Sequence, residues 1–194
     1  MFGLLFVATF NSFGQTTMNE NNTKIVSDKS NVADSLISST EVNEFSDAVV
    51  YGDFEKVKKM IYNNPNIINS KDKYGFSALH NVMCEEQFEI VKYLINKGAD
   101  VNIQNDQGIA PIHLACYVKN VELLIKAGAN INMKDKEGNT PLSILTAEGE
   151  ESIEVIRYLL LKGADRNIKN NYGEIPLDIA RKRNEKVIIK LLEK

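Results

Sequence analysis

The sequence predicts an all-α protein in which about five helix–turn–helix units stack side by side, with a protruding turn between neighbouring units. Three observations carry this prediction. A glycine recurs in the same context at positions 75, 108, 138 and 173. A second glycine begins a Gly-Ala-Asp or Gly-Ala-Asn phrase at positions 98, 128 and 163. Polar, turn-forming residues lie between paired glycines, and apolar residues at helical spacing lie on both sides.

Residues 98–115 show how one boundary between units is built. Gly98 follows an apolar run at helical spacing, where the end of a helix favours a residue that tolerates positive φ. Pro111 stands three residues after Gly108, and proline suits the first turn of a new helix. Asp, Asn and Gln lie between the two glycines, and such side chains stabilise turns by bonding to nearby backbone. The stretch therefore predicts a helix end, a protruding turn and a helix start.

The repeated phrases resemble the ankyrin repeat family. The glycines at positions 75, 108, 138 and 173 are 33, 30 and 35 residues apart, and a period near 33 with a Thr-Pro-Leu-His-like phrase is the ankyrin signature. Versions of that phrase are Ser77-Ala78-Leu79-His80, Ala110-Pro111-Ile112-His113, Thr140-Pro141-Leu142 and Ile175-Pro176-Leu177. The resemblance covers residues 41–194 and implies repeats at about 41–71, 72–104, 105–134, 135–169 and 170–194.

Composition narrows the possible functions. With 194 residues and 43% hydrophobic content, the chain can bury the core of one domain. A net charge of −3 does not favour a nucleic-acid binder. No apolar run reaches the ~18–20 residues that span a bilayer, so we expect no stable membrane insertion. Two cysteines are too few for a disulfide-built scaffold. We also expect the protein to be a monomer.

The N-terminal residues predict export. Residues 2–10 are apolar and uncharged, and the small residues Ser12 and Gly14 follow, which is typical of a secretory signal over residues 1–14. We therefore expect a periplasmic or secreted protein. The basic residue that normally precedes the apolar run is missing, so either the start lies upstream or the signal is weak. A buried strand is the alternative, but the polar residues 15–40, which we predict to be a flexible linker, would tether it poorly.

The repeats differ in length. The glycines of the second repeat are 23 residues apart (75 to 98), and we expect its helices at about 77–84 and 88–96. Those of the third repeat are 20 apart (108 to 128), which predicts a second helix cut to about 121–126. Those of the fourth are 25 apart (138 to 163), and the surplus predicts an exposed acidic loop at 148–152.

The two ends of the array are expected to be atypical, because one side of each end repeat meets water. The first repeat ends in Asn63-Asn64-Pro65 instead of a Gly-Ala phrase. The last repeat carries six Lys or Arg residues from Arg181 onward against two Glu, which predicts a solubilising end cap rather than a site for anions.

Helix capping predicts the weakest part of the array. Thr140 keeps the capping hydroxyl before proline, whereas Ala110 and Ile175 cannot cap, at a cost of ~1 kcal/mol each. Because the shortened repeat adjoins one of these losses, we expect residues 108–127 to be less protected from hydrogen exchange than residues 77–97.

His80, Cys84, His113 and Cys116 form the one candidate metal set. Two Cys and two His are a zinc ligand set, and each pair shares a helix face. However, stacked helix axes lie ~8–10 Å apart, while all ligands must lie ~2.0–2.3 Å from one zinc ion. The ankyrin resemblance implies instead that both histidines bond to the backbone of neighbouring turns. We expect no metal and no cofactor.

Two further interpretations of the cysteines remain open. Export permits a Cys84–Cys116 disulfide, but the residues lie nine and eight positions after their glycines, so we expect their side chains to point differently. A thiol nucleophile with a histidine base lacks a third, orienting group. Because a Gly-rich phosphate loop, a Gly-x-Ser-x-Gly elbow and a His-Glu-x-x-His helix are also missing, we expect no catalytic residues and no enzyme. The alternative is a thiol- or zinc-dependent protein that uses these four residues.

The ankyrin resemblance implies that this protein binds a protein partner through its turn tips and concave helix edges. Its role could be that of an inhibitor, an immunity factor or a periplasmic scaffold. The positions that match the family's contact surface are Lys73, Tyr74, Phe76, Asp106, Gln107, Ile109, Tyr117, Lys136, Glu137, Asn139, Asn171, Tyr172 and Glu174. Solvated aromatic and aliphatic residues in a row suit an interface. For Phe76 and Ile109 the alternative is packing between adjacent turns.

Overall fold

The computed structural model of the protein describes residues 37–194. The predicted signal over residues 1–14, and the predicted linker up to residue 36, lie outside the described residues. The helices are α2 (Ser39–Val50), α3 (Phe54–Asn63), η1 (Pro65–Asn69), α4 (Ala78–Asn81), α5 (Phe88–Asn96), η2 (Pro111–Leu114), α6 (Val118–Lys126), α7 (Pro141–Glu148), η3 (Glu150–Ser152), α8 (Ile153–Leu161), α9 (Pro176–Lys182) and α10 (Lys186–Leu192). Within this range the β pairing is limited to one isolated bridge, Lys71–Ser77.

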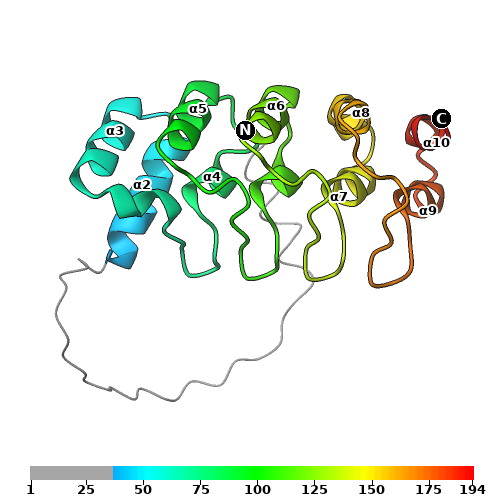
Figure 1. Ribbon diagram of the computed structural model, residues 1–194, viewed down its shortest axis with the longest axis horizontal. Helices are drawn as coiled ribbons and strands as arrows, with labels where there is room; N and C mark the ends of the chain where they lie inside the picture. Colours follow the sequence, from blue (N-terminus) through cyan, green and yellow to red (C-terminus); the bar gives the residue numbers. More distant parts are fainter. Residues whose placement is uncertain (1–36) are drawn as a thin grey trace, which may run out of the picture. The chain divides into compact units, whose positions relative to one another are not determined.

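The helices form a row of pairs, and long turns project from one side of the row (Figure 1). Each pair is one repeat: α2 with α3, α4 with α5, η2 with α6, α7 with α8, and α9 with α10. The first helices contact one another in chain order, as α2 with α4, α4 with η2, η2 with α7, and α7 with α9. The predicted all-α stack is confirmed. Among residues 37–194, none of the helices has the length and apolar character needed to cross a bilayer.

A single apolar core runs along the row between the helix layers. Leu79, Leu94, Leu124 and Leu142 are at most 1% exposed, and they come from three successive repeats. Fully burying a leucine stabilises the fold by roughly 1.5–3 kcal/mol. Since each repeat packs its apolar face on the next, no repeat has a complete core of its own.

The first helix begins at Ser39, two residues before the predicted start of the array. Ser38 is the N-cap: its Oγ accepts a hydrogen bond from the Glu41 backbone N–H (3.2 Å), and the Glu41 carboxylate accepts one from the Ser38 N–H (2.9 Å). This reciprocal arrangement is a capping box, and its Ser-x-x-Glu pattern is visible in the sequence.

The predicted shortening of the second helix in the third repeat is wrong. Helix α6 has nine residues, as α5 and α8 have. The first helices α4 and η2 both have four residues, so the three missing residues fall in the link to the second helix, which covers residues 82–87 in the second repeat and only residues 115–117 in the third. Val121 and Leu124 of α6 are fully buried against neighbouring repeats. Shortening α6 would remove such contacts, so the link between the two helices absorbs the deletion.

The predicted exposed loop at residues 148–152 is wrong at its two ends. Glu148 is half-buried at the end of α7, and Ser152 is buried at the end of η3. Only Glu150 and Glu151 of the four polar side chains are exposed. The surplus residues form a second short turn that folds back onto α7 rather than a loop in solvent.

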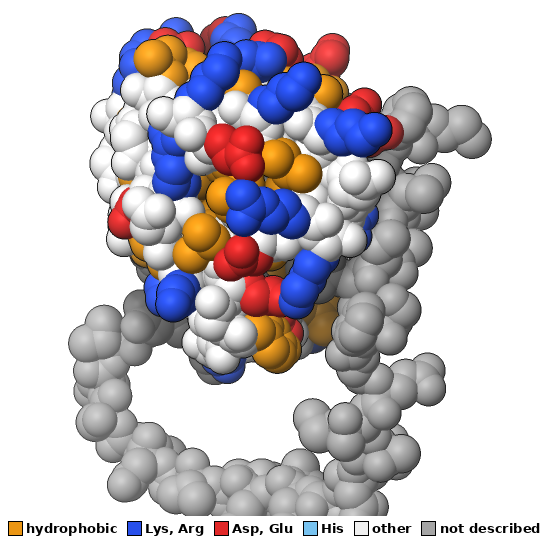
Figure 2. Space-filling model, turned by 90° about the vertical axis from the view of Figure 1, so that its right-hand side faces the viewer, with side chains coloured by type: hydrophobic (Ala, Val, Ile, Leu, Met, Phe, Trp, Pro, Cys, Tyr) orange, Lys and Arg blue, Asp and Glu red, His pale blue; other side chains and the backbone are white. Residues whose placement is uncertain are grey.

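Basic side chains dominate the outer side of the last repeat. Figure 2 views this end and shows Lys and Arg side chains spread over it, with fewer Asp and Glu between them. Arg181 pairs with Glu193 at 3.0 Å, and Lys182 pairs with Glu174. Exposed ion pairs contribute only ~0–1 kcal/mol each, so this end is polar without being rigidly cross-linked.

Candidate functional site: the turn tips and the short-turn edge

One side-chain oxygen organises each protruding turn. In the second repeat Asp72 Oδ1 accepts hydrogen bonds from the backbone N–H groups of Tyr74 (2.8 Å) and Phe76 (2.9 Å). Equivalent bonds are made by Asn105, Asp135 and Asn170 in the three later turns. Because the turn is closed by its own side chain, its tip is held without a neighbouring strand.

Neighbouring turns are also tied to each other through their backbones. The N–H of Lys136 donates to the carbonyl of Gln107 (2.9 Å), and the N–H of Asn171 donates to the carbonyl of Glu137 (2.8 Å). These bonds join the tips of the last three turns into one surface.

A ladder of side chains adds a second connection between turns. Lys71 Nζ donates to the Gln104 carbonyl (2.7 Å), Gln104 Nε2 to the Lys134 carbonyl (3.1 Å), and Lys134 Nζ to the Lys169 carbonyl (2.9 Å). The four residues recur with the same 33, 30 and 35 spacing as the turn glycines. That periodicity was available in the sequence, and our prediction did not use it.

Eight of the thirteen predicted contact residues are exposed and lie at the tips. We call this set the tip row: Lys73, Tyr74, Asp106, Gln107, Lys136, Glu137, Asn171 and Tyr172. Tyr74 is 58% exposed and Tyr172 is 72% exposed, so an aromatic ring stands at each end of the row with charged and amide groups between them.

Four predicted contact residues are buried or half-buried rather than exposed. Ile109 is only 3% exposed, so its predicted role in a surface contact is wrong and the alternative, packing between turns, holds. Phe76 is half-buried and packs edge-on against the ring of His80, with centroids 5.6 Å apart. Asn139 and Glu174 are half-buried, and Glu174 pairs with Lys182. An apolar side chain in this position is sheltered by the next turn.

Tyr117 lies away from the turns. It is the residue before α6, and its ring packs edge-on against Phe88 with centroids 5.6 Å apart. The predicted site is therefore two surfaces, the tip row and an edge formed where first helices end and second helices begin. We call the latter the short-turn edge, defined by residues 50–54, 84–89 and 115–119.

Both histidines join adjacent repeats through backbone hydrogen bonds. In each ring Nδ1 accepts from the N–H at the start of its own helix: Ser77 for His80 (3.0 Å) and Ala110 for His113 (3.1 Å). Nε2 of His80 donates to the Ile109 carbonyl in the next turn (2.9 Å), and Nε2 of His113 donates to that of Met133 (3.0 Å). The role implied by the ankyrin resemblance is confirmed.

These bonds require neutral imidazoles, because Nδ1 must be an acceptor. Burial lowers the pKa of His80 to about 4 and lowers that of His113. The same bonds partly replace the missing caps. His113 Nδ1 accepts a hydrogen bond from the Ala110 N–H, and Asp178 Oδ2 accepts one from the Ile175 N–H (3.2 Å). These bonds partly offset the loss of helix stability, ~1 kcal/mol each, that is expected at positions without a capping side chain.

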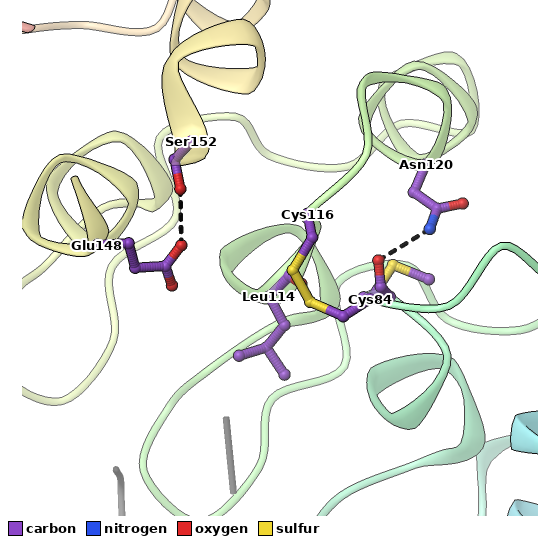
Figure 3. Close-up of a disulfide and its surroundings, with 7 residues drawn as sticks. Cys84, Leu114, Cys116, Asn120, Glu148 and Ser152 are labelled. Carbon is purple, nitrogen blue, oxygen red and sulfur yellow. Dashed lines mark hydrogen bonds between the residues drawn. A yellow bond between two sulfur atoms is a disulfide. The ribbon is translucent and has the colours of Figure 1, made fainter. Parts of the chain in front are cut away.

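The structure joins Cys84 and Cys116 in a disulfide, with Cα atoms 4.9 Å apart (Figure 3). Our prediction that these side chains point differently is wrong. It assumed that both cysteines lie on the first helices of their repeats. However, α4 ends at Asn81 and η2 ends at Leu114, so both cysteines lie in the links that follow, where the distance from the turn glycine does not set the direction of a side chain. Asn120 Nδ2 donates to the Met83 carbonyl beside the bridge (2.9 Å), so α6 is held against the second repeat twice.

The four candidate metal ligands do not form a metal set. Both sulfurs are in the disulfide, and the ring nitrogens of both histidines bond to backbone. Over residues 37–194, His, Cys, Asp and Glu side chains do not gather in groups of three or more that could hold a metal. The thiolate that a nucleophile or a zinc site needs is absent from this arrangement.

Glu148 is the carboxyl group with the largest perturbation in the described part of the chain. Burial raises its pKa to about 7, and the charge of Glu151 acts in the same direction. Ser152 Oγ donates a hydrogen bond to Glu148 Oε2 at 2.9 Å (Figure 3), which favours the ionised form but does not outweigh burial. Sequence reasoning missed this group because its burial depends on how η3 folds back.

We expect Glu148→Gln to stabilise the protein by about 2 kcal/mol at pH 8 and to have little effect at pH 5. The Glu148 carboxyl has a higher pKa in the folded state than in the unfolded state. The contribution of its neutral form to the stability of the fold is therefore complete below about pH 4.5 and is lost as the pH rises through about 7. Gln keeps an acceptor for Ser152 and carries no charge. Urea unfolding at both pH values measures this.

Glu150→Gln is the control, since Glu150 is exposed and, unlike Glu151, does not contribute to the raised pKa of Glu148, so its substitution should change stability by less than about 0.5 kcal/mol. A Glu148→Gln variant that is less stable than the parent at pH 8 would contradict the burial argument.

Comparison with known proteins agrees with this geometry. The family description "Ankyrin repeats (3 copies)" matches residues 45–135 and 112–194. Notch-regulated ankyrin repeat-containing protein of Xenopus tropicalis is 32% identical over 76 residues, which are 38% of this chain and 67% of that protein. Protein phosphatase 1 regulatory subunit 27 of Mus musculus is 32% identical over 72 residues, 37% of this chain and 47% of that protein.

A third relative is much longer. Alpha-latrocrustotoxin-Lt1a of Latrodectus tredecimguttatus is 37% identical over 68 residues, which are 35% of this chain and 5% of the toxin. The chain spans less than half the length of this toxin and of the phosphatase subunit. These relatives share a repeat type rather than a whole-protein architecture. With the family match, the five stacked helix pairs and the histidine bonds between repeats, the chain belongs to the ankyrin repeat family.

Proposed function

We propose that this protein is a non-catalytic interaction module that binds a protein partner outside the cytoplasm through the tip row. Ankyrin repeats act as protein–protein interaction modules, and a relative is named as a regulatory subunit of a phosphatase. The observation that carries the proposal is the tip row itself: eight exposed side chains on turns that are closed internally and tied to one another.

Rigid display is the proposed mechanism. Side chains on a preformed surface lose less conformational entropy on binding than side chains on a mobile loop. Tyr74 and Tyr172 supply the two largest exposed apolar areas of the row, and tyrosine is enriched among the residues that dominate binding energy. The charged and amide groups between them provide orientation and specificity.

Export is supported by two independent features. Residues 1–14 have the character of a secretory signal, and the Cys84–Cys116 disulfide is of a kind that persists in oxidising compartments and is rare in the cytosol. In a periplasmic or secreted setting the protein acts as an inhibitor or immunity factor that covers another protein, or as a scaffold for one.

The test is capture of the partner by cross-linking in the native envelope fraction, followed by binding with purified components. We expect Tyr74→Ala with Tyr172→Ala to weaken binding at least about 30-fold, since two anchor residues are each worth ~1–2 kcal/mol or more. Helicity measured by circular dichroism should be unchanged, because both side chains are exposed.

Tyr62→Ala is the matched control. Tyr62 is 87% exposed, but it lies on α3 and not on a turn, so its loss should leave binding unchanged. Equal weakening by Tyr62→Ala, or full binding by the double variant, would contradict recognition through the tip row.

A further inference from the structure

A groove lies on the short-turn edge, at the ends of the helices remote from the protruding turns. It has a volume of about 280 Å³, and its walls come from three repeats: Gly52 and Phe54 of the first, Glu86, Phe88 and Glu89 of the second, and Lys119 of the third. Ligand pockets for small molecules usually occupy ~300–1,000 Å³. This groove is smaller and open to one side, so its size suits one or two side chains of a partner.

The apolar part of the groove is formed by two phenylalanine rings that are each fixed by a second ring. Phe54 packs edge-on against Tyr93, with centroids 5.2 Å apart, and Phe88 packs in the same way against Tyr117 at 5.6 Å. Both phenylalanines are half-buried. Their rings are therefore held in place while part of each remains open to a partner.

Each of the two phenylalanine rings already carries a lysine ammonium group. Lys58 Nζ lies 4.8 Å from the centroid of the Phe54 ring and also pairs with Glu55. Lys119 Nζ lies 4.6 Å from the centroid of the Phe88 ring. An ammonium or guanidinium group within about 6 Å of a ring centroid is attracted by the electrons of the ring face. Lys119 is thus engaged with the ring and makes no ion pair with a carboxylate within the described residues.

The rim of the groove is acidic. Glu86 and Glu89 are exposed, and over residues 37–194 neither forms an ion pair. Exposed glutamates elsewhere on second helices do have partners at this helix position, as Glu55 has in Lys58 and Glu154 has in Arg157. Two carboxylates beside fixed aromatic rings are complementary to a long side chain with an apolar stem and a cationic head.

We infer that this groove binds an arginine or lysine side chain, next to an apolar residue, in a peptide segment of a protein partner. The stem lies against the parts of Phe54 and Phe88 that Lys58 and Lys119 leave open, and the cationic head lies between the carboxylates of Glu86 and Glu89. The surface is separate from the tip row, so it extends the proposed function with a second recognition site. Its test does not involve Tyr74 or Tyr172, and the two proposals can fail independently.

The experiment uses the full chain labelled with nitrogen-15 and three peptides that differ in one side chain: acetyl-Ala-Leu-Arg-Leu-Ala-amide and its Gln and Glu equivalents. We expect the Arg peptide to shift the backbone amide signals of Gly52, Phe88 and Lys119, with saturation at millimolar concentration. Binding of the Gln peptide should be at least about five-fold weaker, and the Glu peptide should cause no saturable shift. Added salt should weaken binding of the Arg peptide, because it screens the attraction between the peptide and the two carboxylates.

Glu86→Gln with Glu89→Gln should weaken binding of the Arg peptide at least about five-fold. Glu154→Gln is the matched control, because Glu154 is the second residue of α8 as Glu89 is the second residue of α5. Glu89→Gln and Glu154→Gln each remove a charge from a helix N-terminus, but only Glu86 and Glu89 line the groove. The control should bind as the parent does.

Several results would overturn the inference. They are equal binding of the three peptides, shifts confined to the tip row, or no saturable shift with the Arg peptide. Groove signals that move with protein concentration alone would assign the surface to a second copy of the chain. Signals of residues 15–36 that move together with those of the groove would assign it to the chain's own N-terminal segment.

Discussion

Loss of the Cys84–Cys116 disulfide is expected to lower the free energy of unfolding by about 4 kcal/mol. The bridge closes a loop whose ends are 32 residues apart, and restricting the unfolded chain over a loop of that length is worth ~3.5–4 kcal/mol in the chain-entropy account. The total stability of a domain is only ~5–15 kcal/mol, so this loss is large. Urea unfolding of the protein with and without a phosphine reductant measures it.

The position of the bridge makes a second measurement informative. It joins the second repeat to the third, where the first helix is only the turn η2 and the link to α6 is short. After reduction we expect residues 108–127 to lose hydrogen-exchange protection before residues 77–97, because a defect in a linear stack separates it into parts. The Cys84→Ala with Cys116→Ala variant should match the reduced protein and should not respond to reductant. Equal loss of protection along the array would contradict this account.

Gly108→Ala is expected to cost about 3 kcal/mol or more. Gly108 has φ of +78°, a conformation that costs an alanine ~1–2 kcal/mol. A Cβ at this position would also lie 2.8 Å from the backbone nitrogen of Lys136 and 3.1 Å from the carbonyl carbon of Asp135. Those atoms belong to the backbone of the next turn and cannot rotate away, so the turns must separate, at a further cost of ~1–3 kcal/mol.

Gly98→Ala separates these two terms. Gly98 has φ of +95°, but a Cβ there would meet nothing within 4 Å, so only the conformational cost of ~1–2 kcal/mol applies. Thermal or urea unfolding of the two variants should differ by at least about 1 kcal/mol. Variants of equal stability would show that the close approach of neighbouring turns contributes nothing.

The architecture could be predicted because its cause is local and repeated. Glycines with positive φ, the Asx side chains that close the turns, and apolar residues at helical spacing recur with a common period, as at Gly75 and Gly108 or at Asp72 and Asn105. A repeat of this length cannot bury its apolar face alone, so the period implies stacking. The histidine bonds followed from the same periodicity through the ankyrin resemblance.

The contact surface could be predicted only in part. Exposure at Tyr74 and Tyr172 follows from their place at turn tips, which the sequence marks with glycine. Ile109 stands just as close to its glycine, yet it is buried because the neighbouring repeat covers it. Distance from a turn glycine determines where a residue lies in its own turn, but not what the next turn covers.

The sequence by itself determined the repeat unit, the number of units and the protruding turns, because bonds within a few residues and helical periodicity set these. Only the tertiary structure decided that Cys84 meets Cys116, that Glu148 is buried, and that a groove forms beside Phe88. Each of these depends on how residues from one end of a repeat meet other segments. The third repeat is three residues shorter and the fourth two residues longer than the second, as their glycine spacings of 20, 25 and 23 show, and both changes fall between the two helices of a repeat. Packing rather than spacing decides how the chain absorbs them.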